Sequence, residues 1–293
     1  MTNQNYDLVH QNYSRLGIVL VLWTLAPALT ARTVPTDVSE VSFHQMAVNP
    51  NSELSPQQKL RAEQLISLFE NSTLEFQYGY AQVLGDGRGV TAGRAGFTTG
   101  TGDAYVVVKQ YTDKIPQNPL ARYLPELKRL LTAENRDDIS RLGGFIKAWQ
   151  DAAKDPVFRS IQDRNVERMY YLPSTVHAKV QGLSFALARA VLYDTIIQHG
   201  NGNDPDSLSA LLKETQQRVG GTPKTGVDEQ KWLNTFLQVR RAHLAHAHNR
   251  DTRKVWAESV TRVDVWSAIA DSGNFNLTGP IEIRVSHYNT TIP

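Results

Sequence analysis

Cysteine is missing from all 293 positions of the sequence. Its absence excludes disulfide bonds, thiolate metal sites and a cysteine nucleophile. It does not settle the compartment, because a large domain is stable without disulfide bonds. The sequence also has no large excess of charge of one sign. Its 31 lysines and arginines nearly balance its 29 aspartates and glutamates, which gives a net charge of +2. This balance predicts that nucleic acid is not a partner.

Long hydrophobic runs are scarce as well. The most apolar run, residues 16–29, carries no charge and is shorter than the roughly 20 residues of a membrane span. An arginine precedes it and small residues follow, an order typical of a secretory signal peptide; an N-terminal anchor or a buried helix are the alternatives. We expect residues 1–31 to be a signal peptide, cleaved after Ala28 or Ala31, and residues 32–54 a linker or N-terminal extension. The mature protein is then secreted, extracellular and free of the membrane.

Strand patterns are few, whereas helical patterns are many. The folded part is predicted to begin at Ser55, because Ser55, Pro56 and Gln58 make a capping-box sequence. Apolar residues at helical spacing follow in six further regions. These are residues 60–69, residues 120–131, one long helix over 173–198 with Val176 and Val180 inside and Gly200 at its end, residues 208–212, residues 232–239, and a last helix capped by Asp251 that runs to Ile269.

The remaining pattern indicates a small β element. Residues 281–287 alternate at period two, and the glycine-rich stretch 85–102 is able to form a small sheet or hairpins. The predicted class is mainly α (α+β). The length suits one large domain or two lobes around a cleft, and we expect residues 55–293 to form it.

Two carboxylates are candidates for acid and base chemistry. Glu70 ends an amphipathic helix beside Leu68 and Phe69, where partial desolvation favours its neutral, proton-donating form. Asp86 lies sixteen residues later among three glycines, and we expect it to be exposed in a tight loop. A glycosidase needs such a pair, although spacing alone leaves an ordinary helix-end Glu and an ordinary turn as alternatives.

A third acidic residue, Asp194, interrupts an apolar run of the long predicted helix. A buried aspartate needs cationic or hydrogen-bonding partners. Arg240 and Arg262, on later helices, are the candidates. An exposed position on the helix remains the alternative from the residues alone.

Several motifs of other functions are missing. There is no G-x-S-x-G elbow, and the G-x-G-x-G at 85–89 lacks the strand and spacing of a dinucleotide site. The histidines His243, His246 and His248 have no carboxylate at a ligand spacing between them, so we expect a solvated helix end there. No metal and no cofactor are therefore predicted.

Several segments occur in an order that is specific to one family. They read FENST at 69–73, GDGRGVT at 85–91, GFTTGTGD at 96–103, YDTIIQHG at 193–200, FLQVR at 236–240 and TRVD at 261–264. Over about residues 55–285 the chain closely resembles the family 46 glycoside hydrolases, the chitosanases, most closely those of the secreted Bacillus type. The histidine-rich segment 243–248 and the long N-terminal region depart from the family's usual sequence.

The resemblance implies a two-lobed, lysozyme-like fold with a substrate cleft between the lobes. It also implies endo-acting hydrolysis of β-1,4 links in chitosan with inversion at the anomeric carbon, by a monomer. The resemblance assigns roles to eleven residues: acid Glu70, base Asp86 and water-holding Thr91; cleft residues Asn71, Tyr80, Arg88, Asp103 and His199; and a buried network of Asp194, Arg240 and Arg262 near the acid.

The physical chemistry of chitosan agrees with these assignments. Chitosan is a polyamine, so carboxylates are expected along its groove, and Asp103 is able to pair with a glucosamine ammonium. Two alternatives stay open. One is a lysozyme-like hydrolase of peptidoglycan or chitin, and the other is a non-catalytic carbohydrate-binding protein.

Overall fold

The computed structural model describes residues 53–250 and 253–293. The predicted signal peptide, nearly all of the predicted linker, and Asp251 lie outside the described residues. The described elements, in chain order, are α2 (Pro56–Asn71), β1 (Ala81–Val83), β2 (Val90–Ala92), β3 (Phe97–Thr98), α3 (Asp103–Lys114), η3 (Ala121–Tyr123), α4 (Leu124–Leu130), α5 (Phe145–Ala152), α6 (Pro156–Val166), the π-helix η4 (Glu167–Tyr171), α7 (Leu172–Gln181), α8 (Ala186–His199), α9 (Leu208–Val219), η5 (Pro223–Thr225), α10 (Glu229–Ala245), α11 (Arg253–Glu258), α12 (Val260–Asp271), β4 (Ile281–Val285) and β5 (Tyr288–Ile292). The predicted mainly α class with a small β element is confirmed.

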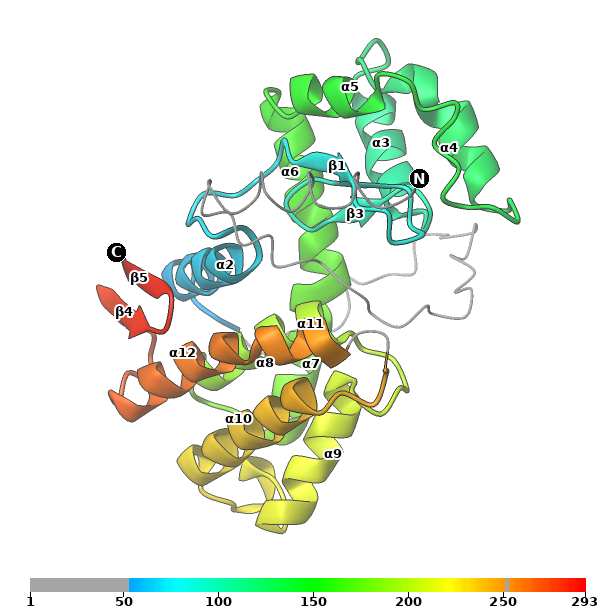
Figure 1. Cartoon of the computed structure of the whole chain (residues 1–293). Coiled ribbons are helices and arrows are strands. Elements are labelled where there is room, and N and C mark those ends of the chain that lie inside the picture. The colour runs from blue at the N-terminus through cyan, green and yellow to red at the C-terminus, as the bar shows by residue number, and fades with distance from the viewer. Residues whose placement is uncertain (1–52, 251–252) are drawn as a thin grey trace, which may run out of the picture.

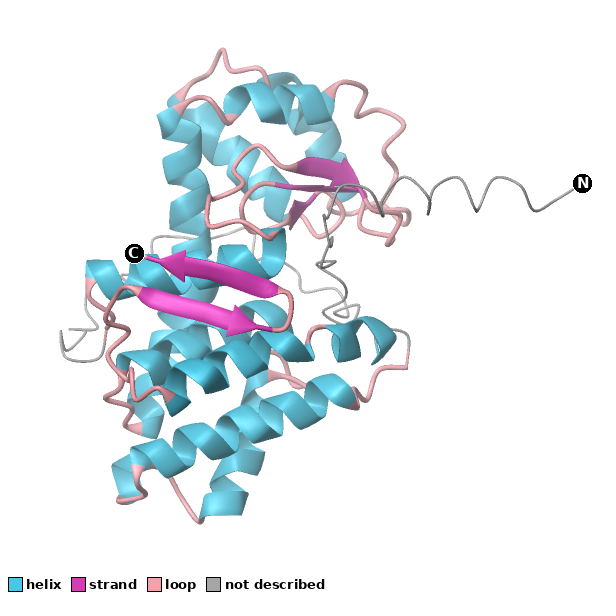
Figure 2. Ribbon diagram, turned by 60° about the vertical axis from the view of Figure 1, so that its left-hand side comes forward, coloured by secondary structure: helices cyan, strands magenta, loops and turns pink. Residues whose placement is uncertain are grey.

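These elements form two groups (Figure 1). The upper group contains the sheet β1–β3 with α3, α4 and α5, and the lower group contains α7 to α12. Helix α6 runs from the upper group to the lower one, where it continues into η4 and α7. The β4–β5 hairpin lies over the lower helices and contacts α2 and α12 (Figure 2). In the described part of the chain, no helix is long and apolar enough to cross a bilayer.

Helix α2 begins as its sequence predicts. Ser55 Oγ accepts a hydrogen bond from the backbone N of Gln58 at 3.3 Å, and Gln58 Oε1 accepts one from the backbone N of Ser55 at 2.9 Å. This capping box satisfies two amide donors at the helix start. The helix ends at Asn71, where Ser72 takes a left-handed conformation with φ 55°. The residue before Asn71 is Glu70, which lies on the buried side of the last turn.

The glycine-rich stretch forms the expected small sheet. Strands β1, β2 and β3 pair antiparallel, with Val83 opposite Val90 at the end of β1–β2. The connecting loop carries Asp86 between glycines of positive φ. At Gly89, φ is +75° and a Cβ atom would lie 2.2 Å from Thr99 Oγ1, so only glycine fits where the loop meets the residue that follows β3.

The prediction of one helix over 173–198 is wrong. Gly182 ends α7 with φ 77°, and the backbone N of Leu183 donates to Ala178 O at 3.0 Å in a Schellman arrangement. The chain also approaches η5 closely here, since a Cβ atom at Gly182 would lie 2.6 Å from a backbone nitrogen. Val176 and Val180, predicted to be inside, are more than half exposed.

Two other predicted helices are interrupted. The helix predicted to run to Ile269 is divided into α11 and α12 at Ser259, whose Oγ donates to Trp256 O at 2.7 Å and so competes with the helical hydrogen bonds. Residues 120–131 form η3 and then α4, because Pro125 has no amide hydrogen to continue the first turn. The predicted helices at 208–212 and 232–239 are confirmed as parts of α9 and α10. The strand predicted at 281–287 forms as β4, which ends at Val285, two residues earlier than predicted.

Candidate active site

Glu70 lies in an apolar environment near the end of α2. Its neighbour Phe69 packs edge-on against Trp266 and Tyr288, with ring centroids 5.8 and 5.4 Å apart. Glu70 is buried, and this burial raises the pKa of its carboxyl although the charge of Arg262 pulls the pKa down. A carboxyl held neutral in this way is able to donate a proton.

Arg262 joins Glu70 to the fully buried Asp194. Its Nη1 donates to Glu70 Oε1, while its Nη2 and Nε donate to Asp194 Oδ1 at 2.5 and 2.9 Å. Trp266 Nε1 donates to Asp194 Oδ2 at 2.8 Å, and Arg240 Nη1 lies 2.7 Å from the same oxygen as an ion pair without hydrogen-bond geometry. The structure thus brings together the three residues of the predicted network.

The charges within this network favour an ionised Asp194 and a neutral Glu70. Burial by itself would raise the pKa of Asp194, but the charges of Arg262 and Arg240 outweigh it and lower the pKa to about 2. The negative charge of Asp194 then adds to the burial that raises the pKa of Glu70. Because Asp194 and Glu70 share the guanidinium of Arg262 and Asp194 is the ionised partner, Glu70 is easier to protonate.

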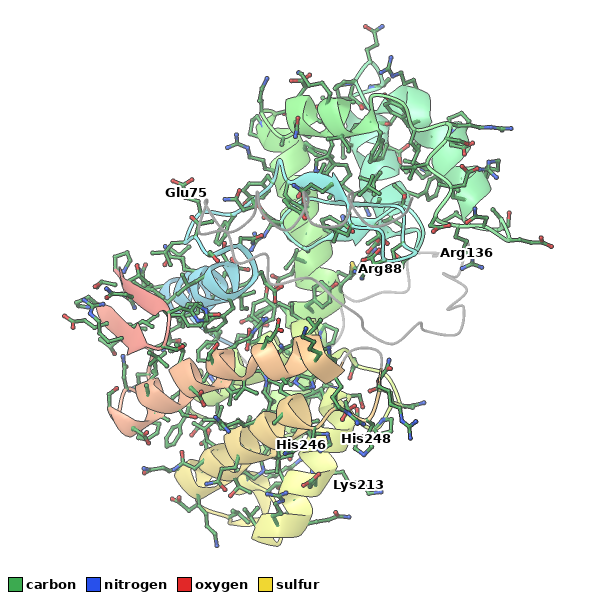
Figure 3. All side chains as sticks on the ribbon, in the orientation of Figure 1. Glu75, Arg88, Arg136, Lys213, His246 and His248 are labelled. Carbon is green, nitrogen blue, oxygen red and sulfur yellow. The ribbon has the colours of Figure 1, made fainter. Side chains whose placement is uncertain are left out.

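Asp86 is less exposed than its glycine-rich loop predicts, with a side chain 11% exposed. The reason is Arg88, whose Nε and Nη2 donate to Asp86 Oδ2 at 2.9 and 2.6 Å, while its backbone N donates to Oδ1 at 3.1 Å. Arg88 is expected to bind substrate, but in this structure it forms a salt bridge with Asp86. Arg88 lies on the side of the upper group that faces α11 (Figure 3). The charge of Asp86 also reaches Tyr80, where it adds to burial in raising the pKa of the phenol.

Thr91 lies in the middle of β2 and is fully buried. Its Oγ1 has no hydrogen-bond partner within residues 53–250 and 253–293. A buried hydroxyl without a partner is costly unless water or a ligand satisfies it. The position is therefore suited to hold a water molecule.

Asp103 begins α3 and is held by its surroundings through one oxygen. Its Oδ1 accepts hydrogen bonds from the backbone N of Thr98 at 2.6 Å, from Thr101 Oγ1 at 2.7 Å and from the backbone N of Ala104 at 2.9 Å. Burial nevertheless raises the pKa of this carboxyl. A cation bound at the other oxygen would favour its charged form. Asn71, the last residue of α2, is partly exposed next to Glu70.

His199 is more deeply buried than is expected of a cleft residue. Its ring is only 1% exposed and packs edge-on against Trp256, with centroids 4.9 Å apart. The ring Nδ1 bonds with the backbone O of Asp206 at 2.7 Å. Burial, together with the charge of Arg240, lowers the pKa of His199 to about 3. The ring lies beneath the surface, and its Nε2 has no hydrogen-bond partner among the described residues, so the expected contact with a sugar hydroxyl stays a prediction.

Tyr170 is a residue of this region that the sequence did not single out. It lies in the π-helix η4, between α6 and α7. Burial raises the pKa of its hydroxyl, and the charges of Asp103 and Glu70 raise it further while Arg88 lowers it, so the phenol is within electrostatic reach of α2 and of the upper group. π-helical turns are frequent at functional sites. The sequence around Tyr170 and Tyr171 contains no pattern from which a π-helical turn could be predicted.

The histidine-rich segment also differs from its prediction. His246 is exposed, as expected for a solvated helix end. His243 is not, since its side chain is 11% exposed and contacts carboxylates of Asp206 and Glu214 at 2.8 and 2.9 Å. These carboxylates come from α9 and the segment before it, so local spacing in the sequence could not reveal them.

Residues 64–281 match the family described as Glycosyl hydrolase family 46. The chain belongs to this family. The family 46 chain is 54% identical over 239 residues to a chitosanase from Bacillus subtilis (strain 168), a match that covers 82% of this chain and 86% of that protein.

Solved structures lead to the same family. One is a mutant chitosanase from Bacillus subtilis MY002 complexed with 6 GlcN, with a TM-score of 0.75 and 54% identity over 82% of this chain and 100% of that one. Another is a GH46 chitosanase from Gynuella sunshinyii in complex with chitotetraose, with a TM-score of 0.75 and 44% identity over 82% of this chain and 99% of that one. The family 46 chain is thus a glycoside hydrolase with a mainly helical, lysozyme-like fold, as the sequence indicated.

Proposed function

We propose that this glycoside hydrolase cuts β-1,4 links inside chitosan, with Glu70 as the general acid and Asp86 as the base that activates water. The proposal depends above all on the burial of Glu70, which raises its pKa against the pull of Arg262. An inverting glycosidase needs one carboxyl kept protonated and one carboxylate beside a water molecule. Glu70 lies in the last turn of α2, whereas Asp86 lies on the β1–β2 loop of the upper group, so the two carboxyl groups come from separate elements.

The acid step uses the network behind Glu70. Glu70 gives its proton to the glycosidic oxygen as the bond from that oxygen to the anomeric carbon breaks. Desolvation favours the neutral acid beforehand, and Arg262 stabilises the carboxylate that remains afterwards. Asp194 shares the guanidinium of Arg262, which prevents Arg262 from holding Glu70 ionised at the start.

The base step uses the loop of the small sheet. Asp86 accepts a proton from a water molecule as that water attacks the anomeric carbon from the face opposite the leaving oxygen. Arg88 fixes the carboxylate through three hydrogen bonds, and the free hydroxyl of Thr91 holds the water. Inverting enzymes keep the two carboxyl groups about 6.5–9.5 Å apart to leave room for this water.

Chitosan is the proposed substrate because of its amines. Relatives of this chain are chitosanases, and one is complexed with 6 GlcN. Asp103 has one carboxylate oxygen without a hydrogen bond from the described residues, which suits a glucosamine ammonium, while Asn71 and Tyr80 bond sugar hydroxyls. Asp103→Asn should then raise KM more than it lowers kcat, because an ammonium–carboxylate pair exists in both the ground state and the transition state.

The acid and base assignments are tested by isosteric variants. Glu70→Gln and Asp86→Asn should each lower the release of reducing ends from soluble chitosan by at least about 100-fold, since general acid–base catalysis contributes about 10²–10⁴-fold. Glu75→Gln is the matched control, because Glu75 follows α2 and points to solvent (Figure 3). Near wild-type turnover in either variant would show that its residue is not catalytic.

The stereochemistry is tested by proton NMR of a fresh digest, read before mutarotation equalises the anomers. Attack by a water molecule bound to Asp86 gives the α-anomer first. An initial β signal would mean a nucleophilic carboxylate within about 5–5.5 Å of the acid, and would overturn the role of Asp86 as base. Fully N-acetylated polymer provides the substrate control: if it is cut as fast as chitosan, recognition of an amine by Asp103 is wrong.

Secretion completes the proposal. Residues 1–31 are removed as a signal peptide on export, and residues 55–293 work outside the cell as a monomeric catalytic domain. Mass spectrometry of the protein recovered from a culture medium tests this, since cleavage after Ala28 or Ala31 gives distinct masses. Retention of the full-length chain in the cell pellet would contradict it.

A further inference from the structure

Three side chains from two distant segments converge beside α9 and α10. His243 is near the end of α10, His248 follows that helix, and Asp206 lies just before α9. His243 Nδ1 and His248 Nδ1 each lie 2.8 Å from the same atom, Asp206 Oδ1. Possible ligand atoms of the three residues all lie within 4.8 Å of one another. Figure 3 shows His246 and His248 at this end of α10, close to Lys213 of α9.

The carboxylate at the centre of this cluster is fixed in place. Asp206 is buried, and its Oδ2 accepts a hydrogen bond from the backbone N of His248 at 2.8 Å. Its own backbone N donates to Asp204 Oδ1 at 3.0 Å. Asp206 Oδ1 is therefore directed at the two imidazoles before any ligand binds, which removes much of the ordering cost of binding.

The contacts of the cluster require a hydrogen on several imidazole nitrogens at once. An ionised carboxylate only accepts hydrogen bonds, so both Nδ1 atoms must carry hydrogen to contact Asp206 Oδ1. His243 also places Nε2 2.9 Å from Glu214 Oε2, so this ring must be doubly protonated if protons alone hold the cluster. A single dication between Asp206 and the two Nδ1 atoms replaces these protons and leaves His243 neutral.

The two nitrogen–oxygen distances fit a metal ion after a small expansion. Zinc–nitrogen and zinc–oxygen bonds of about 2.0–2.2 Å at tetrahedral angles place ligand atoms about 3.3 Å apart. The nitrogen–oxygen distances of 2.8 Å need to lengthen by roughly half an ångström. His248 has room to make this change, because its side chain is 60% exposed.

The surroundings supply the remaining parts of such a site. Glu214 would accept the Nε2 hydrogen of His243, as carboxylates commonly do behind zinc-bound histidines. A surface hollow of about 620 Å³, lined among others by Pro205, Lys213, His243 and His248, leaves space for water as a fourth ligand. Two imidazole nitrogens and one carboxylate oxygen suit Zn²⁺ and the neighbouring late transition metals better than Mg²⁺ or Ca²⁺.

We propose that Asp206, His243 and His248 bind one Zn²⁺ ion, with Glu214 as the hydrogen-bond partner that orients His243. The ion would tie the segment between α8 and α9 to the end of α10. Because Asp206 O bonds with His199, the last residue of α8, the site also braces the helix that carries Asp194. The role is structural, since none of these side chains contacts Glu70 or Asp86.

The test is calorimetric titration of the chelator-treated full chain with Zn²⁺ near neutral pH, without chitosan. We expect one ion per chain. At Zn²⁺ about 100-fold above Kd, we also expect a rise in Tm on the order of 5–10 °C. Titration with Co²⁺ should give the visible absorption of a site with nitrogen and oxygen ligands, which reports binding independently of stability.

Two variants and one control locate the ion. His248→Ala should weaken binding by more than about 100-fold, because the loss of even an outer partner typically costs 10–100-fold. Glu214→Gln should weaken it less, and His246→Ala, an exposed histidine of the same segment, should bind as the wild type does.

Two results would overturn the proposal. A wild-type chain that gives neither heat nor a rise in Tm with Zn²⁺ would mean that protons alone hold the cluster. Equal affinity of the wild type and of His248→Ala, with unchanged Co²⁺ absorption, would place the ion elsewhere.

Discussion

Asp194 is the residue whose removal tests the structure most severely. Its carboxylate is fully buried and accepts hydrogen bonds from Arg262 and Trp266, and it forms an ion pair with Arg240, which is buried as well. Removing it leaves two guanidiniums in the core with one remaining carboxylate, Glu70. Loss of one partner of a buried ion pair typically costs about 3–5 kcal/mol. For a domain of this size we therefore expect Asp194→Ala to lower Tm by roughly 6–20 °C.

The matched control is Asp264→Ala. Asp264 pairs with Arg241 at 2.8 Å, a distance similar to those around Asp194, but its side chain is 34% exposed. Exposed pairs contribute about 0–1 kcal/mol, so Tm should change by no more than about 4 °C. Differential scanning calorimetry of the two variants and the wild type, at one pH and one salt concentration, gives the comparison.

The conservative variant Asp194→Asn separates stability from catalysis. The negative charge of Asp194 helps to raise the pKa of Glu70, so its neutralisation should lower that pKa. Activity that needs a protonated Glu70 is lost as pH rises through this pKa. The alkaline limb of kcat/KM against pH should therefore move to lower pH in Asp194→Asn and stay in place in Asp264→Ala.

Two results would refute this reasoning. A Tm of Asp194→Ala within about a degree of the wild type would show that the network contributes no net stability. An unchanged alkaline limb in Asp194→Asn would show that Asp194 does not set the protonation of the acid.

Three further predictions concern single features of the structure. Thr91→Val should lower kcat by about 3- to 10-fold without lowering Tm, because the variant loses one hydrogen bond to water from a hydroxyl with no other described partner. A variant with the kcat of the wild type would show that this hydroxyl has no role in catalysis. Gly89→Ala should destabilise the fold in urea more than Gly85→Ala, because both have positive φ but only Gly89 would place a Cβ atom against Thr99, and equal urea midpoints would contradict the close approach. Because the pKa of His199 is lowered in the folded protein, the unfolded chain binds a proton at this residue first as pH falls below about 6.5. The free energy of unfolding should therefore drop on the order of 3 kcal/mol between pH 7 and pH 4. A His199→Gln variant should lose less of its free energy of unfolding over that range.

Local patterns predicted the elements whose causes are local. The capping box at Ser55, the apolar spacing of α9 and α10, and the alternation of β4 each depend on residues only a few positions apart. The same approach failed at Gly182, where continuous helical spacing concealed a left-handed end that also permits close contact with η5. Periodicity alone could not distinguish one long helix from two that meet there.

The candidate acid was partly predictable for the same reason. The position of Glu70 at the end of an apolar helix turn indicated desolvation, and burial does raise its pKa. The pairing of Asp86 with Arg88 was not anticipated, although the residues are two positions apart, because a glycine-rich loop allows many conformations. Only the folded loop determines that the carboxylate is held rather than exposed.

The sequence by itself determined the family and the helical class, and it singled out Glu70 and Asp86 as the candidate acid and base, because ordered motifs and short-range spacing can be read along the chain. Tertiary structure alone decided which charges meet. Arg262 contacts Glu70 across 192 positions, Asp206 reaches His243 across 37, and His199 is buried beneath Trp256. Burial and pairing depend on packing between distant segments, and the pKa of a carboxyl or an imidazole follows from that packing rather than from its neighbours in sequence.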